Sequence, residues 1–393
     1  MKRLILILAA VSLGGGTLAA QNTIEDVLAR VEQASIAMEA QRKLTDAQKL
    51  EAKTGNYLAN PSVEYESLWG DKTNRGNMGE LTVTQAFDFP SVYGNRNKIA
   101  RLKGQMYEQE GAAFRQQILL EAKMVCLEII YLRQEQALLS EQFANAQQLY
   151  QAYQQQLDAG NTNIIAVNKI SIERLNAQTA LNLNGTALRS KLEQLANLVG
   201  GEPLDFNSQV YPPEATLPPL AEIETHYVNS NPMLQALEHS YGIDQKSVAL
   251  NRSLSLPQFE VGYRQNFGME GKAKGFLVGI SVPLFENKNK VKAAKARSFF
   301  AQAQMQSTKL NLRTELNQLY EQAQTLQRSG EELQQLLNHQ NNLEILKKAL
   351  DAGQIDIIEY FTEVNILFES RGQLLQIERD YRLATAQLFR YSL

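Results

Sequence analysis

The residue types that most often perform catalysis or bind metal ions are scarce in this chain. Its three histidines, His226, His239 and His339, are widely separated, and none has a second ligand at metal-binding spacing. The only cysteine, Cys126, lies in an apolar helical stretch, so no disulfide framework exists. We find no glycine-rich phosphate loop, no nucleophile elbow and no pair of catalytic carboxylates. The sequence therefore predicts no catalytic residue, no metal, no cofactor and no enzyme activity.

Carboxylates gather instead beside two matching breaks in long helical stretches. The sequence LDAG at 157–160 recurs at 350–353, and Asp356 and Glu359 follow the second copy. Glycine can adopt the left-handed conformation that ends a helix, so each copy predicts a helix end. Carboxylates repeated around an opening would focus a negative potential and favour cations. Alternatively, Asp356 and Glu359 are first-turn acids that complement a helix N-terminus.

Polar and apolar residues alternate in two further segments, 60–90 and 256–285. A period of two places one set of side chains on each face of a β-strand, and each segment has two such runs around a Gly-containing loop. We predict a β-hairpin in each, with Phe276, Val282 and Leu284 continuing the apolar set of the last strand. The main apolar set is Val63, Tyr65, Val83, Phe87, Val261, Tyr263, Val278 and Ile280. The polar set is Glu64, Glu66, Thr82, Thr84, Glu260 and Arg264, together with Asp88.

Both hairpins belong to a longer repeat. The sequence NRNKI at 95–99 recurs as NKNKV at 287–291, which is 192 positions later, and the two LDAG copies are 193 positions apart. Similar offsets for separate landmarks indicate a tandem duplication of about 190 residues.

Long stretches without proline allow each half to be helical after its hairpin. A helix over 98–157 would be about 90 Å long, and we expect its counterpart over 290–350. We predict this order: a signal peptide at 1–20, an N-terminal helix at 21–59, the first hairpin at 60–90, the first long helical hairpin at 91–200, a linker and helix at 201–255, the second hairpin at 256–285 and the second long helical hairpin at 286–393.

The start of the chain has the features of a secretory signal. Lys2 and Arg3 precede an apolar run over 4–13, which is too short to span a bilayer, and small residues follow it. Removing the two cations lowers the formal net charge from −3 to −5 (−3 − 2). No basic face for nucleic acid is present.

Two arrangements fit the alternating strands. A soluble sheet could rest its apolar face on helices. Alternatively, the apolar face could contact lipid while the polar face lines a wet lumen, as in membrane β-barrels. Sheet edges in a bilayer must be paired, so four strands per chain would close a barrel with other chains. The secretory signal and the duplication favour the membrane arrangement.

Two repeats of a β-hairpin and a long helical hairpin, each with a Gly-centred break, resemble the TolC-like outer-membrane efflux proteins. The resemblance is carried by LTVTQAF at 81–87, GISVPL at 279–284, the two Asn-Lys-rich helix starts, Gly160 and Gly353. It implies a mainly α protein with a small membrane β part. It also implies a homotrimer that closes a 12-stranded β-barrel, continued by a periplasmic α-helical tunnel. The implied partners are a periplasmic adaptor, an inner-membrane transporter and outer-membrane lipid.

The resemblance also implies a periplasmic tip that opens and closes. In the family, charged residues and a Tyr–Arg contact close the tunnel, but the aligned positions here hold Ala166 and Ile355. Asp356 and Glu359 are candidate replacements. The predicted tip comprises Asp158, Gly160, Ala166, Asp351, Gly353, Ile355, Asp356 and Glu359.

Other functions remain open at this stage. The same channel could serve as the exit duct of a type I protein secretion system. A protein of a different class, a periplasmic coiled-coil adaptor without a barrel, would carry one helical hairpin and several small β-domains, whereas this chain has two matched hairpins. The sequence does not identify the exported substrate, because a passive tunnel needs no specific pocket.

Overall fold

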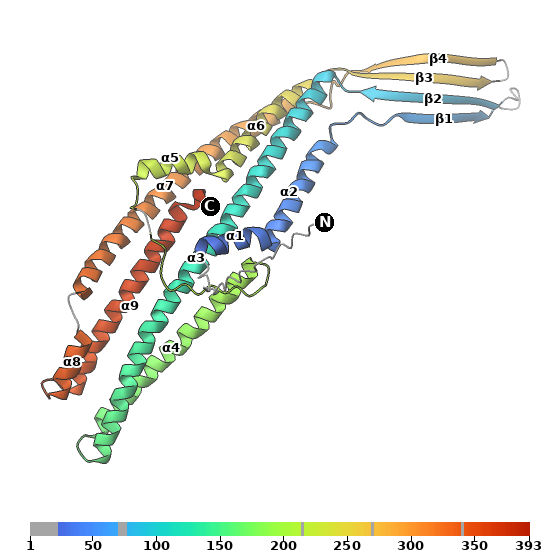
Figure 1. The fold of residues 1–393 in the computed structure, drawn as a ribbon. Helices are drawn as coiled ribbons and strands as arrows, with labels where there is room; N and C mark the ends of the chain where they lie inside the picture. Colours follow the sequence, from blue (N-terminus) through green and yellow to red (C-terminus); the bar gives the residue numbers. More distant parts are fainter. Residues whose placement is uncertain (1–22, 70–76, 214–215, 269–270, 339–341) are drawn as a thin grey trace, which may run out of the picture. The chain divides into compact units, whose positions relative to one another are not determined.

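A computed structural model of the chain describes residues 23–69, 77–213, 216–268, 271–338 and 342–393 (Figure 1). The predicted signal peptide at 1–20 lies outside the described residues. The described chain is mainly helical with one small antiparallel sheet. It divides into two compact units: the first comprises the residues up to 34 and 125–214, and the second comprises 35–124 and the residues from 215 onward.

The sheet belongs to the second unit. Its strands are β1 (Ser62–Trp69), β2 (Asn77–Phe87), β3 (Gln258–Gly268) and β4 (Gly271–Ser281), and each strand pairs antiparallel with the next in the order β1-β2-β3-β4. The pairing of β2 with β3 joins the two halves of the sequence. We predicted that Val282 and Leu284 would extend the last strand, but β4 ends at Ser281. Pro283 offers no N–H group and restricts the residue before it, which accounts for the earlier end.

The first unit contains α1 (Ile24–Ala34), the later part of α3 (Pro90–Asp158) and α4 (Ile164–Leu198). Asn184 of α4 donates a hydrogen bond from Nδ2 to the carbonyl oxygen of Leu132 in α3, at 3.0 Å, and Lys191 forms an ion pair with Glu128. The most buried apolar side chains of this unit are Val27, Val31, Ile129, Ile130, Ile170, Leu195 and Phe206. Helix α3 begins at Pro90, earlier than predicted, because proline is well suited to the first helical position.

The other helices lie in the second unit, where α7 packs against both α6 and α9. Their bounds are α2 (Ile36–Thr54), α5 (Leu220–Ser230), α6 (Pro232–Ser253), α7 (Lys290–Asn338), α8 (Asn342–Asp351), α9 (Ile357–Leu388) and a 3₁₀ turn, η1 (Arg390–Ser392). One core cluster of this unit contains Ile223, Tyr227, Leu316, Ala323, Ala384 and Leu388.

Two predicted helices differ from the structure. The N-terminal helix expected over 21–59 is two helices, α1 and α2, which are separated at Ser35. The helix expected over 290–350 is described as α7 and α8, and residues 339–341 between them lie outside the described part. Between α5 and α6, Asn231 accepts hydrogen bonds from the backbone N–H groups of Met233 and Leu234, which caps α6.

Candidate functional site

The register of the sheet brings the predicted apolar residues onto one face. Residues directly opposite each other in an antiparallel pair point to the same side. Val63 lies opposite Val83, Val83 opposite Tyr263, and Tyr263 opposite Phe276. We call this side the apolar face; its apolar members are Val63, Tyr65, Leu81, Val83, Phe87, Phe259, Val261, Tyr263, Phe276, Val278 and Ile280. The register also places Gln85, Gln265, Lys272 and Lys274 on this side.

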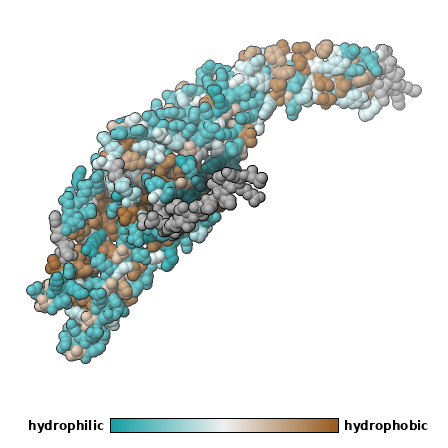
Figure 2. All heavy atoms as spheres, in the orientation of Figure 1, coloured by the Kyte–Doolittle hydropathy of each residue, from teal (hydrophilic) through white to brown (hydrophobic). Residues whose placement is uncertain are grey.

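Side chains of the apolar face are uncovered within the chain. Phe276 is 92% exposed and Val278 is 78% exposed. Figure 1 shows no helix of the second unit lying over the described strands, and Figure 2 shows hydrophobic residues gathered on the sheet. Soluble monomers rarely leave an apolar patch of this kind in water. A lipid or protein surface is therefore needed to cover it.

The opposite side, the polar face, carries charge. It includes Glu64, Glu66, Glu80, Thr82, Thr84, Glu260, Gly262 and Arg264, and the register also places the apolar Ala86 and Leu277 on this side. Arg264 Nε lies 2.9 Å from Glu80 Oε1, and the Thr82 hydroxyl donates to the same oxygen at 3.3 Å. Glu80 lies opposite Glu66, so the Arg264 ion pair offsets the repulsion between these two carboxylates. The sequence prediction missed Glu80, although its alternation with Gly79 and Leu81 places it on this side.

The predicted member Asp88 does not belong to the polar face. It follows the end of β2, where its carboxylate accepts a hydrogen bond from Arg96 Nη1 at 2.8 Å. This side chain is only 18% exposed. The period of two ends with the strand, so alternation cannot place a residue beyond Phe87.

Two strands of the described sheet have an unpaired edge. In the order β1-β2-β3-β4, β1 and β4 each have a neighbour on one side only. Their outward N–H and C=O groups form a template for another strand. The apolar face, the polar face and the two open edges together define the first candidate functional region.

The first helical break is a complete C-terminal cap. Gly160 has φ +73°, its N–H donates to the Leu157 carbonyl at 3.0 Å, and the Asn161 N–H donates to the Gln156 carbonyl at 2.8 Å. These are the two bonds of a Schellman motif, which glycine favours because a Cβ disfavours positive φ. Asn163 then caps α4 by accepting from the Ala166 N–H at 3.0 Å. Ala166 itself is buried, whereas Asp158 is exposed.

The second break has the same C-terminal cap and a stronger helix start. Gly353 has φ +68° and donates to the Leu350 carbonyl at 3.0 Å. Asp356 Oδ1 accepts from the backbone N–H groups of Ile358, at 2.7 Å, and Glu359, at 2.8 Å. Glu359 Oε2 in turn accepts from the Asp356 N–H at 3.1 Å, which completes a capping box.

Both acids of the second break therefore cap a helix, as the alternative interpretation expected. They remain exposed, and so does Asp351, whereas Ile355 is half-buried. Their charges are thus available to solvent beside the break.

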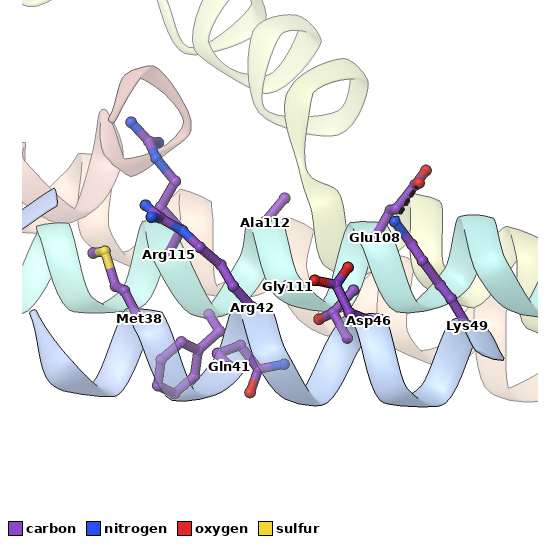
Figure 3. A pocket seen from close by; sticks show the side chains of 11 residues that line it. Met38, Gln41, Arg42, Asp46, Lys49, Glu108, Gly111, Ala112 and Arg115 are labelled. Carbon is purple, nitrogen blue, oxygen red and sulfur yellow. Dashed lines mark ion pairs between the residues drawn. The ribbon is translucent and has the colours of Figure 1, made fainter. Parts of the chain in front are cut away.

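A pocket of about 430 Å³ lies between α2 and α3 in the second unit (Figure 3). The Lys49–Glu108 ion pair, with Nζ to Oε1 at 2.6 Å, closes one end. Arg42 and Arg115 extend together at the other end, where Arg115 Nη1 also donates to a main-chain oxygen of Leu393 at 3.0 Å. These polar contacts join α2, α3 and the last residue of the chain, so the pocket belongs to the seam between helices.

No group of histidine, cysteine, aspartate or glutamate in the described residues could hold a metal ion. No helix in the described part of the chain has both the length and the apolar character needed to cross a membrane.

Solved structures with the same fold are outer-membrane channels and related membrane proteins. A membrane protein from Pseudomonas aeruginosa matches with a TM-score of 0.80 and 15% identity, over 94% of this chain and 89% of that one. The VceC outer membrane protein of Vibrio cholerae matches with a TM-score of 0.77 and 15% identity, over 94% and 95%. The CmeC outer membrane channel of Campylobacter jejuni matches with a TM-score of 0.74 and 13% identity, over 94% and 85%. The chain thus has the fold of this class of channels.

The sequence comparison is more specific. Residues 227–392 match the family model of the outer membrane efflux proteins, and no curated protein matches the chain. The C-terminal part of the chain is therefore similar to the outer membrane efflux proteins, and the predicted resemblance to the TolC-like efflux proteins is confirmed.

Proposed function

We propose that this chain is the outer-membrane channel of a tripartite efflux pump and that it conducts substrates passively across the periplasm and the outer membrane. The observation that carries this proposal is the uncovered sheet, which is apolar on one side and charged on the other. A bilayer covers the apolar face without any protein layer, and water in a lumen solvates the polar face.

The open edges support closure between copies. Because the four strands alternate in direction, β4 of one copy can pair antiparallel with β1 of the next. Three copies would then close a barrel of twelve strands with no free edge, as a bilayer requires. Strands β2, β3 and β4 each have 11 residues, which is the length of a tilted membrane strand.

The long helices supply the second half of the duct. Helix α3 has 69 residues, which corresponds to about 100 Å of helix rise and suits a rod through the periplasm. In a homotrimer each break would be present three times, so the exposed Asp158, Asp351, Asp356 and Glu359 would surround the periplasmic mouth. The helical tips there would receive a periplasmic adaptor, which would link the channel to an inner-membrane transporter.

Fractionation and conductance test the proposal together. The full-length protein, expressed with its own first 20 residues, should fractionate with the outer membrane. It should run as a trimer that resists detergent, and purified trimers should open ion-conducting pores in planar bilayers. Recovery as a soluble periplasmic monomer, or trimers that conduct no ions, would contradict the proposal.

A further inference from the structure

The sheet meets the helices of the second unit at a network of polar contacts that includes both halves of the sequence. Asp88 lies between β2 and α3, and its carboxylate accepts from Arg96 Nη1 at 2.8 Å and from Gln258 Nε2 at 2.9 Å. Arg96 belongs to the first turns of α3, whereas Gln258 begins β3. The Asp88 N–H also donates to the hydroxyl of Tyr93 at 2.9 Å. One carboxylate thus joins a helix of the first half to a strand of the second.

Two asparagines of the repeated Asn-Lys motif meet in the same place. Asn95 Nδ2 donates to Ser253 Oγ at 3.0 Å, and Asn287 Nδ2 donates to the carbonyl oxygen of Leu254. Ser253 is buried and its hydroxyl donates onward to the Ala249 carbonyl, so this hydroxyl both donates and accepts. The motif copies, 192 positions apart in sequence, therefore attach to adjacent residues at the end of α6.

Two of the connections between the sheet and the helices are short, so these contacts affect the direction in which the helices leave the sheet. Only Asp88 and Phe89 separate β2 from α3, and four residues separate α6 from β3. The backbone hydrogen bonds within these connections, such as Val92 N–H to the Phe89 carbonyl and Leu256 N–H to the Ser253 carbonyl, run along the helix side and do not reach the strands. The side-chain contacts described above are therefore the bonds that join α3 and α6 to the strands next to them. The ring of Phe89 adds to them, since its centroid lies 6.4 Å from that of Phe259.

We infer that Asp88, Arg96, Gln258, Asn95, Ser253 and Asn287, which we call the junction, hold the long helices in one direction relative to the sheet and thereby set the width of the passage where barrel meets tunnel. The inference rests on the proposed channel function. The junction residues are positioning residues, because they act on conduction through the direction of the helices. Loss of a junction contact leaves the strands paired but allows several helix directions, hence several widths.

Single-channel recording of purified trimers in planar bilayers tests the junction. The variants are Asp88→Asn and Arg96→Gln, which each remove the ion pair, and the double variant Asn95→Ala, Asn287→Ala, which removes both amides. Lys288→Gln is the matched control: Lys288 occupies the position of Arg96 in the second motif copy, and it is exposed. Arg96→Lys is the conservative variant, because lysine keeps the charge beside Asp88.

We expect parent trimers and Lys288→Gln trimers to conduct at one level. The junction variants should form trimers in similar amounts, but these trimers should switch among several conductance levels. Arg96→Lys trimers should conduct at the single parent level. Asp88→Asn and Arg96→Gln change the local charge in opposite directions. A purely electrostatic effect would therefore shift the ion selectivity of the two variants in opposite directions. Loss of a single helix direction would instead produce several conductance levels in both variants.

Three results would overturn the inference. The junction variants could keep the parent level, or they could form few trimers whose conductance equals that of the parent, which would indicate a role in stability alone. They could also fail to assemble at all, which would make the junction a folding requirement. Failure of the proposed function itself is distinguishable, because parent trimers would then open no pores.

Discussion

A single arginine placed on each side of the sheet tests the proposal that the apolar face contacts lipid and the polar face lines a lumen. Val83 and Thr84 are neighbours near the middle of β2, the 11-residue strand that pairs with both β1 and β3. Val83 lies on the apolar face opposite Tyr263, whereas Thr84 lies on the polar face opposite Gly262. Because Gly262 has no side chain, an arginine at 84 would meet no side chain from the residue directly opposite. Its diagonal neighbours would be Glu260, an opposite charge, and Arg264, a like charge that is already paired with Glu80.

The expected difference is large. An arginine on the lipid side of a barrel strand costs about 2–4 kcal/mol near the bilayer midplane. At 1.4 kcal/mol for each factor of ten, this corresponds to roughly 30- to 700-fold per chain. The proposed trimer would carry the substitution three times, so the total penalty for Val83→Arg would be about 6–12 kcal/mol. In the proposed lumen, the arginine of Thr84→Arg would face water and would escape this penalty.

Semi-native gel electrophoresis of outer-membrane extracts measures the assembled fraction, with total protein from denatured samples as the reference. We expect Val83→Arg to abolish most of the trimer and Thr84→Arg to retain it with altered conductance. Equal loss of trimer in both variants would refute the assignment of the faces. A greater loss with Thr84→Arg would show that the two sides are reversed.

Three further predictions concern the helical breaks and the buried thiol. Gly353→Val should impair efflux while trimer assembly stays intact, because a side chain at φ +68° costs about 1 kcal/mol or more. Gly353→Asn is the control: asparagine tolerates this conformation, so this variant should retain most efflux in a drug-susceptibility assay. The double variant Asp356→Asn, Glu359→Gln keeps side-chain oxygens that can cap α9 but removes two negative charges. Reversal potentials should therefore show lower cation selectivity than in the parent channel. Unchanged selectivity would contradict the placement of this helical break at the periplasmic mouth. Burial, with a smaller contribution from Glu25, raises the pKa of the Cys126 thiol from 9.0 to about 12, so native protein at pH 8 should resist thiol reagents that react once urea unfolds it. The unfolded chain ionises first, so this thiol's contribution to stability is complete below pH 9 and declines as the pH rises toward 12, and rapid labelling of the native protein would contradict its burial.

Local patterns predicted the strands and caps well. The period of two in 81–87 and 276–280 placed each side chain on the correct one of two faces, because alternation follows from strand geometry alone. Glycine and the polar residues after it likewise predicted both helix ends, since the bonds of a Schellman motif and a capping box join residues within five positions. The roles of these faces and tips in lipid and at a mouth remain predictions.

Local patterns failed where a residue's environment comes from a distant segment. Asp88 was assigned to the polar face by parity, although Arg96 and Gln258 hold it at the junction. The helix expected to start at 98 begins at Pro90, which is suited to the first helical position, and its first turns contact Asp88 through the Tyr93 hydroxyl.

The sequence by itself determined the class of elements: two strand pairs, long proline-free helices, and glycines where helices end. Each of these follows from properties of neighbouring residues, such as side-chain alternation, the missing N–H of proline and the tolerance of glycine for positive φ. The tertiary structure alone decided that β2 pairs with β3 and that Asn95 and Asn287 both attach to the end of α6. Contacts such as Asn95–Ser253 and Asp88–Gln258 join residues 158 and 170 positions apart. Packing brings such residues together, and no short-range pattern in the chain records that proximity.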